Sequence, residues 1–313
     1  MAPFEKILML GTAQWGWTVQ KKEAFQVLDG WIGAGFLHID CATNYPINRN
    51  PVDFRAAEKI LQEYILAHGL QKLQITMKIG SLNNLRTPDV NLSPSFIQMI
   101  TEEYLRVLGS NLSCVMIHWD NRENAAEIRT SLDMLQKMQQ EHGIRPGLSG
   151  IAHPDIYVKA NTGLDLSFDI QLKHNVLQSD FERYKPLTSD GNHWFFAYGL
   201  NAGGVKLEPP YPTESTFLAR GGTPENVAPL LEKINDLRPV WNTAFVRPPV
   251  KTMNHVGLIY AGLHPDLQGI LLGVSSAAQL HETLDFWRNF EVFDYSDVFS
   301  SLKKILLPAP MVA

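Results

Sequence analysis

The sequence predicts an α/β fold, a (β/α)8 TIM barrel that forms one domain over residues 1–313, with a long insertion after the seventh strand. Eight short apolar runs recur along the chain, and turn residues follow each of them. The segments between these runs have helical periodicity. Such an alternation favours parallel strands joined by helices, and eight is the number of strands that closes this kind of barrel. Two average domains would also fit the length, but no composition shift marks a boundary.

Each expected strand is a short apolar run that ends at turn-forming or polar residues. The carboxyl ends of all eight strands of such a barrel meet at one rim, so residues that are distant in sequence can meet there. The expected strands are Ile7–Gly11, Leu37–Asp40, Ile75–Lys78, Cys114–His118, Leu148–Ile151, Phe168–Leu172, Trp194–Tyr198 and Gly269–Gly273.

The helices between these strands have clear start and stop signals. Segment 93–109 begins with Ser93 as its N-cap and Pro94 at the first helical position, and it ends at a glycine. The same pattern predicts helices over 21–33 and 124–142, each followed by a glycine. Segment 93–109 has apolar residues at spacings of three and four, which predict one buried stripe: Ile97, Ile100, Tyr104 and Leu108.

The interval between the seventh and eighth strands breaks this rhythm. About seventy residues separate Tyr198 from Ile270, which is too long for one loop and one helix. We expect a long loop over the mouth of the barrel, followed by one or two helices. After the last strand, Ser276 and Gln279 have the spacing of a capping box, at the start of a helix that would face the mouth.

Composition and charge argue against several classes of protein. The formal charge of −5 comes from acids and bases spread along the chain, without a block of Lys or Arg, so no nucleic-acid partner is expected. No apolar stretch approaches the ~20 residues that span a bilayer, and the amino terminus lacks the pattern of a secretory signal. Cys41 and Cys114 lie in apolar runs without CxxC spacing, so we expect buried, reduced thiols in a cytoplasmic protein.

Ionisable residues stand at the ends of three expected strands. Asp40, Lys78 and His118 each end an apolar run, and Tyr45 follows Asp40 by five residues in a loop. Burying such groups at strand ends without a purpose would be unfavourable. Any one of them alone could be a core residue or a strand cap. A barrel would bring all four to the rim where active sites form.

The segments that contain these residues resemble the successive strand motifs of the aldo-keto reductase family. The resemblance covers roughly residues 7 to 290, and the combination of Asp-x4-Tyr with a Lys and a His is specific. The matching segments are Gly11-Thr-Ala-Gln-Trp-Gly, His38-Ile-Asp-Cys-Ala-Thr-Asn-Tyr45, Thr76-Met-Lys78, Val115-Met-Ile-His-Trp119, Ala197-Tyr-Gly-Leu-Asn-Ala-Gly-Gly204 and Leu272-Gly-Val-Ser-Ser276.

This resemblance implies an NAD(P)H-dependent enzyme that reduces an aldehyde or ketone, sugar-derived carbonyls among them, to an alcohol. Tyr45 would be the general acid, because the alkoxide that hydride addition leaves must be protonated. The ammonium of Lys78 would lower the pKa of this phenol, and Asp40 would pair with Lys78 to compensate its buried charge. His118 would orient the carbonyl oxygen or share the proton transfer.

The resemblance also implies a cofactor site at the carboxyl ends of the strands. Tyr198 would stack on the nicotinamide and Gln171 would bond its carboxamide, while the glycine-rich segment after Tyr198 would lie along the pyrophosphate. The start of the last helix would receive the adenosine end, although Ser276 and Gln279 would serve equally as a helix cap. The other residues expected at the cofactor are Gly11, Thr12, Ala13, Asp40, His153, Gly199, Leu200, Gly203, Gly204, Gly273 and Ser275.

Two departures from the family pattern bear on the cofactor. The fifth strand of relatives ends in Gly-Val-Ser-Asn, whose Ser and Asn bond the carboxamide. Here Gly150-Ile-Ala-His153 replaces it, so one contact is expected to be lost or made by His153. NADPH-preferring relatives hold the 2′-phosphate with a Lys and an Arg, and Gly273 and Gln279 occupy those positions. The usual cofactor preference of the family still favours NADPH, with NADH nearly as well supported.

One other interpretation of the whole protein remains open. A barrel of this family could bind cofactor and serve as a regulatory or channel-associated subunit with little turnover.

Trp15 and Trp119 are expected to line the substrate pocket, although both would also suit simple packing. A metal site is not expected, because Lys78 would bring a cation to the metal's place. Its ligands would have to come from His38, Asp40, His118, His153 and Asp169.

Overall fold

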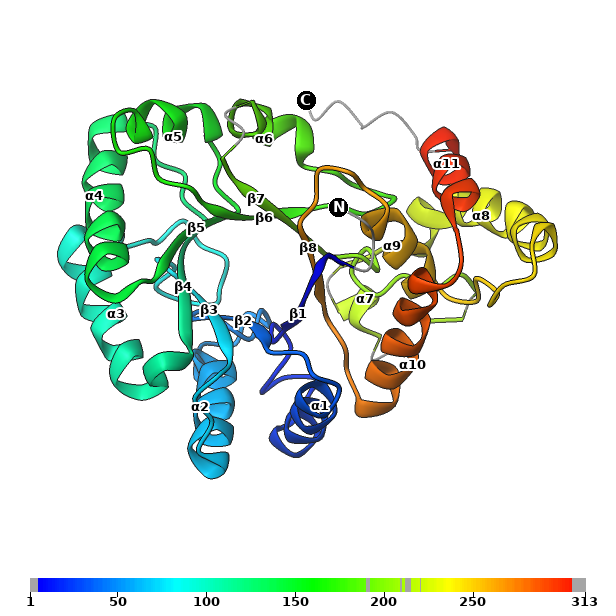
Figure 1. Cartoon of the computed structure of the whole chain (residues 1–313), viewed down its shortest axis with the longest axis horizontal. Helices are drawn as coiled ribbons and strands as arrows, with labels where there is room; N and C mark the ends of the chain where they lie inside the picture. The colour runs from blue at the N-terminus through cyan, green and yellow to red at the C-terminus, as the bar shows by residue number, and fades with distance from the viewer. Residues whose placement is uncertain (1–4, 190–191, 209, 212–214, 220, 306–313) are drawn as a thin grey trace.

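The computed structural model describes residues 5–189, 192–208, 210–211, 215–219 and 221–305, and it contains the predicted barrel. Each strand pairs in parallel with the next along the chain, and β1 pairs with β8 to close the barrel. The strands, labelled in Figure 1, are β1 (Ile7–Gly11), β2 (His38–Ala42), β3 (Gln74–Ile79), β4 (Leu112–His118), β5 (Arg145–Ser149), β6 (Asp169–Lys173), β7 (Trp194–Tyr198) and β8 (Gly269–Leu272).

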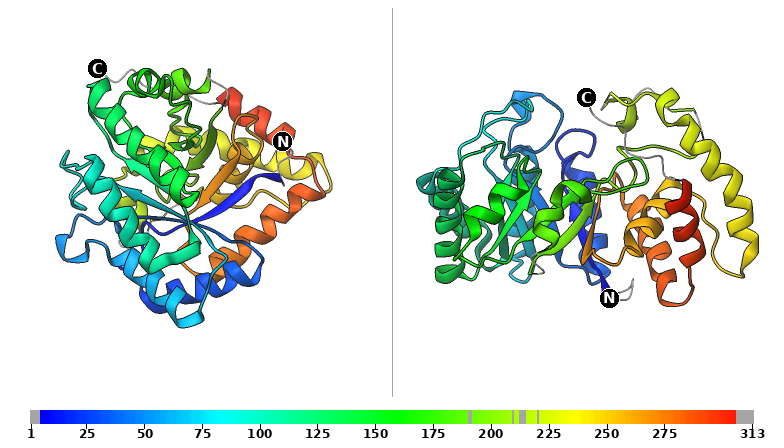
Figure 2. Two further views of the ribbon diagram at one scale, coloured as in Figure 1. Left: turned by 60° about the vertical axis from the view of Figure 1, so that its left-hand side comes forward. Right: turned by 90° about the horizontal axis from the view of Figure 1, so that it is seen from above.

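Helices alternate with the strands and surround the barrel, as Figures 1 and 2 show from three directions. Helices α1 to α6 contact one another in chain order, and α1 also packs against α10, so they form an outer layer. The helices are α1 (Lys21–Gly33), α2 (Ala56–His68), α3 (Pro94–Leu108), α4 (Ala125–His142), α5 (Pro154–Asn161), α6 (Phe181–Thr188), α7 (Thr216–Ala219), α8 (Pro224–Ala244), α9 (Met253–Gly262), α10 (Ala277–Arg288) and α11 (Ser296–Ile305).

The helix signals act as the sequence predicts. At the start of α3 the hydroxyl of Ser93 accepts a hydrogen bond from the backbone N–H of Phe96, which would otherwise lack a partner. Asn124 caps α4, and Gly143 ends it in the left-handed conformation at φ 70°. The predicted stripe of α3 is buried: Ile97, Ile100, Tyr104 and Leu108.

The interval after β7 contains a loop, the single-turn helix α7 and the longer helices α8 and α9, in agreement with the prediction. Helix α9 packs against β8 and α10, whereas α8 packs against α11. These elements, coloured yellow to red in Figure 1, lie together on one side of the barrel. The first residues of the loop, from Gly199 to Gly204, line a pocket at the carboxyl ends of the strands.

The fifth strand differs from the prediction, because it covers Arg145–Ser149 rather than Leu148–Ile151. Pairing with β4 extends it back through Pro146, a residue type that usually marks a strand boundary because it has no N–H to donate. Gly150 ends the strand. Its φ is +66°, and an added Cβ would lie 2.5 Å from Cδ1 of Trp119, so only glycine fits there.

Side chains fill the barrel interior beneath the pocket. Met9, Phe196 and Leu271, from β1, β7 and β8, form a buried cluster of their own. Gly269 leaves room for this packing, since an added Cβ would lie 2.5 Å from the ring of Phe196. The interior of the barrel is therefore a packed core and not a channel.

The cysteines and the helices bear on two further expectations. Cys41 and Cys114 are both buried and free, as predicted. Burial raises the pKa of the Cys41 thiol to about 12, which keeps it protonated at neutral pH. Of the helices within the described ranges, none is long and apolar enough to cross a membrane.

Candidate active site

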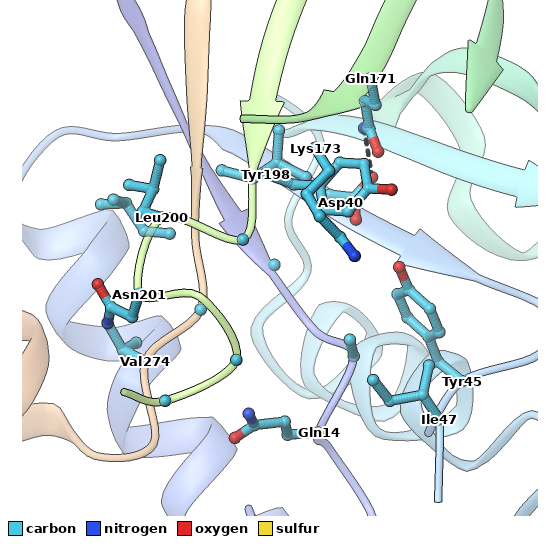
Figure 3. A pocket seen from close by; sticks show the side chains of 18 of the residues that line it. Gln14, Asp40, Tyr45, Ile47, Gln171, Lys173, Tyr198, Leu200, Asn201 and Val274 are labelled. Atoms are coloured by element: carbon cyan, nitrogen blue, oxygen red, sulfur yellow. Dashed lines mark hydrogen bonds between the residues drawn. The ribbon is translucent and has the colours of Figure 1, made fainter. Parts of the chain in front are cut away.

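A pocket of about 460 Å³ lies at the carboxyl ends of the strands, and Figure 3 shows it from close by. Most residues that the sequence assigned to catalysis, cofactor and substrate line it. They are Gly11, Ala13, Asp40, Tyr45, Lys78, His118, Trp119, Gln171, Tyr198, Gly199, Leu200, Gly203, Gly204, Gly273, Ser275 and Gln279.

Four of the buried polar side chains of this pocket come from four different strands. Asp40 lies in β2, Lys78 in β3, His118 at the end of β4 and Gln171 in β6. Strand pairing sets their heights along the barrel. His118 is paired with Ser149 of β5, which is paired with Gln171, so side chains from different strands reach the same level. All four polar side chains belong to residues that are at most 3% exposed.

A closed network of hydrogen bonds joins Asp40, Lys78 and Gln171. The ammonium of Lys78 donates to Oδ2 of Asp40 at 2.5 Å and to Oε1 of Gln171 at 3.0 Å. The amide of Gln171 donates in turn to Oδ1 of Asp40 at 2.6 Å, the bond dashed in Figure 3. Each charged group therefore has two polar partners in place of water, which offsets the free energy of its desolvation.

The ammonium of Lys78 also lies next to Tyr45. Its Nζ is 4.9 Å from the centroid of the Tyr45 ring, and this ring meets that of His118 edge-on at a centroid distance of 6.2 Å. Burial alone would lower the pKa of Lys78, but Asp40 and Tyr45 together raise it above its ordinary value. The four residues expected to act together therefore meet in one pocket, with Lys78 charged at neutral pH.

The pKa of Tyr45 is raised to about 12, because burial disfavours the phenolate more than the Lys78 ammonium favours it. Lys78 does lower this pKa, as predicted, but burial makes the net shift upward. The residue is only 8% exposed, so the loss of hydration outweighs one nearby charge that is already shared with Asp40. A phenol with this pKa keeps its proton at neutral pH, the form that a proton donor requires.

His118 presents a neutral imidazole to the pocket. Burial lowers its pKa well below the ordinary value, and the charge of Lys78 lowers it further. The ring packs on that of Trp119 at a centroid distance of 4.7 Å. Its Nδ1 is buried and has no hydrogen-bond partner within the described part of the chain. The ring can therefore accept or donate a hydrogen bond without competing with the charge of Lys78.

Trp15 and Thr12 do not line the pocket. Trp15 is fully buried in the hydrophobic core, because the loop after β1 turns back where the N–H of Gly16 donates to the carbonyl oxygen of Val19. The hydroxyl of Thr12 donates to the backbone carbonyl oxygen of Asp40 at 2.9 Å. Thr12 therefore links β1 to β2 at Asp40, and it does so beneath the surface of the pocket.

His153 also lies outside the pocket-lining set, since it directly precedes α5 and its Nε2 is 3.5 Å from a carboxylate oxygen of Glu123. The end of β5 at Ser149 moves the family pattern three residues earlier than expected, onto Gly147–Gly150. Ser149 then keeps the serine of the pattern and lines the pocket, while Gly150 stands where relatives have Asn.

The start of α10 forms the end of the pocket assigned to adenosine. The hydroxyl of Ser276 accepts a hydrogen bond from the N–H of Gln279 at 3.2 Å, which confirms the predicted helix cap. The side chain of Gln279 turns to Ser275, whose N–H and hydroxyl donate to it at 2.7 and 2.9 Å. The described lining residues here are uncharged: Asn254, Gly273, Val274, Ser275 and Gln279.

Other residues line the pocket that the sequence had not singled out. Half of them lie in loops, whose paths leave no periodic signal in the sequence. Figure 3 shows Tyr45 and Ile47 on one side of the pocket and Leu200, Asn201 and Val274 across from them. The additional lining residues are Gln14, Ile47, Arg86, Ser149, Lys173, Asn201, Asn254, Leu271, Leu272 and Val274.

Comparison with known proteins agrees with this geometry. The sequence model of the aldo/keto reductase family matches residues 7–306. The chain belongs to the aldo/keto reductase family. Among solved structures, the aldo-keto reductase AKR11C1 from Bacillus halodurans, in its holo form, is similar with a TM-score of 0.68 and 16% sequence identity, over 96% of this chain and 92% of that chain. At this identity the likeness shows a shared fold, and no curated protein sequence matches the chain.

Membership of the aldo/keto reductase family supports, in general terms, an oxidoreductase that reduces carbonyl groups of small molecules. Enzymes of this family use a nicotinamide cofactor. Within the described ranges, no three His, Cys, Asp or Glu side chains form a group that could hold a metal ion. Two of the carboxylates considered as ligands are paired with cations instead, Asp40 with Lys78 and Asp169 with Arg145.

Proposed function

We propose that this protein reduces an aldehyde or ketone to an alcohol with NAD(P)H, and that Tyr45 donates the proton. The observation that carries the proposal is the buried network of Asp40, Lys78 and Gln171 beside the Tyr45 ring, in a pocket at the rim of the barrel. Sugar-derived carbonyls are among the candidate substrates. The free, buried cysteines support a cytoplasmic location.

The pocket has features that suit a nicotinamide dinucleotide. Gly203 and Gly204 line it with φ of +83° and +105°, conformations that favour glycine, and the absence of side chains lets a phosphate approach the backbone closely. Tyr198 would stack on the nicotinamide, and Ser149 would bond the carboxamide. Gln171 could offer only its remaining N–H, because Asp40 and Lys78 already engage its amide. When bound, the cofactor supplies the hydride.

The chain's own residues would handle the proton and the oxygen. Addition of hydride leaves negative charge on the substrate oxygen, and the protonated phenol of Tyr45 donates to it. Lys78, held by Asp40, would stabilise the phenolate that remains. The neutral ring of His118 would orient the oxygen by a hydrogen bond. Asp40 acts as a positioning residue, because it reaches the reaction only through Lys78, and Gln171 helps to position the same ammonium.

This proposal is tested by following the oxidation of NADPH and NADH with a panel of aldehydes, ketones and sugars. Sustained turnover over many equivalents of cofactor is the expected result. Quenching of cofactor fluorescence without sustained turnover would refute the enzymatic role. It would support the alternative, a cofactor-binding regulatory or channel-associated subunit.

The pH dependence of reduction follows from the two shifted pKa values. A raised pKa keeps Tyr45 protonated, so its loss of the proton should reduce the rate only as pH approaches about 12. A lowered pKa keeps His118 neutral, so its protonation should act only well below pH 6.5. We therefore expect a flat kcat/KM between about pH 6 and 9, measured with an aldehyde that does not ionise. A transition centred near pH 7 would contradict this assignment.

The preference between NADPH and NADH is set at the adenosine end. Family habit favours NADPH, with NADH close behind, although the described lining near Gln279 offers no cation to a 2′-phosphate. We expect Gln279→Arg to tighten NADPH binding about tenfold and to change NADH binding less than about twofold, because a guanidinium adds charge-assisted hydrogen bonds. Fluorescence titration measures both affinities.

The control for this substitution is Gln279→Met, which loses the same hydrogen bonds from Ser275 and adds no charge. Equal effects of Gln279→Arg on the two cofactors would show that the 2′-phosphate does not bind at this end.

A further inference from the structure

Arg86, which has no role in the mechanism, lines the pocket, and Arg49 lies in a neighbouring loop. The loop of Arg86 is next to Tyr45, because the amide of Asn84 donates to the backbone carbonyl oxygen of Pro46. Arg86, in the loop between β3 and α3, lines the pocket and also a neighbouring hollow bordered by Trp119. Arg49 lies in the loop between β2 and α2. Partial burial and the charge of Arg49 both lower the pKa of Arg86. The charge of Arg49 therefore acts unfavourably on the guanidinium of Arg86.

A buried side chain holds the two loops together. The amide of Asn84, which is 1% exposed, donates to Oδ1 of Asn48 at 3.1 Å and to the backbone carbonyl oxygen of Asn50 at 2.6 Å. These two acceptors flank Arg49, and Arg86 follows Asn84 by two residues. The loops that carry the arginines are thus fixed to each other.

The backbone at both arginines has a conformation that side chains disfavour. Arg49 has φ 59° and Arg86 has φ 63°, in the left-handed region. Such conformations persist where the surrounding structure imposes them, and they are common at ligand sites.

The acids of the same loops are bonded to neutral groups and not to the arginines. Asp53 accepts hydrogen bonds from two asparagine amides, and Asp89 accepts them from an asparagine amide and a threonine hydroxyl. Over the residues that the structure describes, the side chains of Arg49 and Arg86 have no hydrogen bond or ion pair. Arg86 thus brings a cation to the pocket with Arg49 in the adjoining loop, while Asp53 and Asp89 of these loops are bonded to neutral groups.

We propose that Arg86, with Arg49 beside it, binds an anionic group of the substrate, so that the preferred substrates are carbonyl compounds carrying a carboxylate or a phosphate ester. This inference rests on the proposed function. A guanidinium presents parallel N–H groups that match the oxygens of either anion, and the anion would relieve the repulsion between the two cations. The ring of Trp119, which borders the same space, would contact the body of the substrate.

The phosphates of the cofactor would not occupy this place. The glycine-rich segment that is assigned to them begins at Gly199, and Figure 3 shows Leu200 and Asn201 of this segment across the pocket from Tyr45. Arg86 follows Asn84, whose amide donates to the carbonyl oxygen of Pro46 next to Tyr45, so it remains available on the Tyr45 side. The two ends of the pocket would recognise two different anions.

Two matched pairs of substrates test the proposal with the intact protein and saturating cofactor. The pairs are para-carboxybenzaldehyde with its methyl ester, and glyceraldehyde phosphate with glyceraldehyde. We expect kcat/KM to be at least about tenfold higher for the anionic member of one pair, and this ratio to fall as ionic strength rises. The pair that shows the larger ratio identifies the anion as carboxylate or phosphate. Ratios near one in both pairs would overturn the proposal.

Variants assign the preference to its residue. Arg86→Gln should lower the ratio about tenfold, whereas Arg86→Lys should keep part of it because the charge remains. The matched control is Arg106→Gln, which removes an exposed arginine from the last turn of α3, outside the pocket, and should leave the ratio as in the wild type. An equal loss for the charged and neutral members in Arg86→Gln would overturn the assignment.

Calorimetric titration with benzoate and with inorganic phosphate gives a readout that needs no turnover. Binding of one anion that weakens about tenfold in Arg86→Gln would support the site even if no carbonyl were reduced, and only the proposed function would then fail. Absence of binding by both anions, while neutral aldehydes are reduced, would overturn the anion site and leave the proposed function standing.

Discussion

Replacement of Tyr45 by Phe is expected to lower kcat for carbonyl reduction by about 10²–10⁴-fold and to change cofactor affinity less than about twofold. The substitution removes the phenolic proton and leaves the rest of the site in place. The remaining ring can still lie beside Lys78 and meet His118 edge-on. The effect should therefore fall on the chemical step and not on binding.

Steady-state rates and a fluorescence titration of cofactor measure the two quantities for the Tyr45→Phe variant. Tyr64→Phe is a suitable control, because it removes a hydroxyl that donates to Asp29 at 2.7 Å, away from the pocket. An unchanged kcat in Tyr45→Phe would show that another group supplies the proton.

Replacement of Lys78 by Met is expected to remove most turnover and to lower the free energy of unfolding by about 3–5 kcal/mol. Methionine has a similar length but no charge. The carboxylate of Asp40, only 1% exposed, would keep the amide of Gln171 as its single described side-chain partner. Urea denaturation measures the loss of stability. Full stability of the variant would show that the ion pair does not compensate the buried charge.

The double variant Asp40→Asn with Lys78→Met separates stability from catalysis. It leaves no unpaired charge in the core, so most of the lost stability should return. Turnover should not return, because no ammonium remains beside Tyr45 to stabilise its phenolate. A double variant that regained activity would refute the role assigned to Lys78.

The meeting of the four residues that we propose for catalysis could be predicted because they lie in or near regular elements. Asp40, Lys78 and His118 belong to strands whose apolar runs are visible in the sequence, and parallel strands of a barrel deliver their ends to one rim. Only a few residues separate Tyr45 from β2, so it had to lie at the same rim. Predicting the strands was therefore enough to predict the group.

Residues whose position depends on a loop path or on strand register escaped prediction. Trp15 was expected at the pocket, but the loop after β1 buries it. The strand β5 begins and ends earlier in the chain than the sequence predicted, because it continues back through Pro146. The role now proposed for Ser149 was therefore assigned to His153. Arg86 lies in a loop whose sequence carries no periodic signal.

The sequence by itself determined the barrel, the order of its strands and the residue types at its rim, because local apolar periodicity and turn chemistry encode them. Tertiary structure alone decided the pKa of Tyr45, the bonding of Gln171 to both Asp40 and Lys78, and the effect of the Arg49 charge on Arg86. The reason is that burial, hydrogen-bond partners and charge separation depend on distances between segments that are remote in the chain.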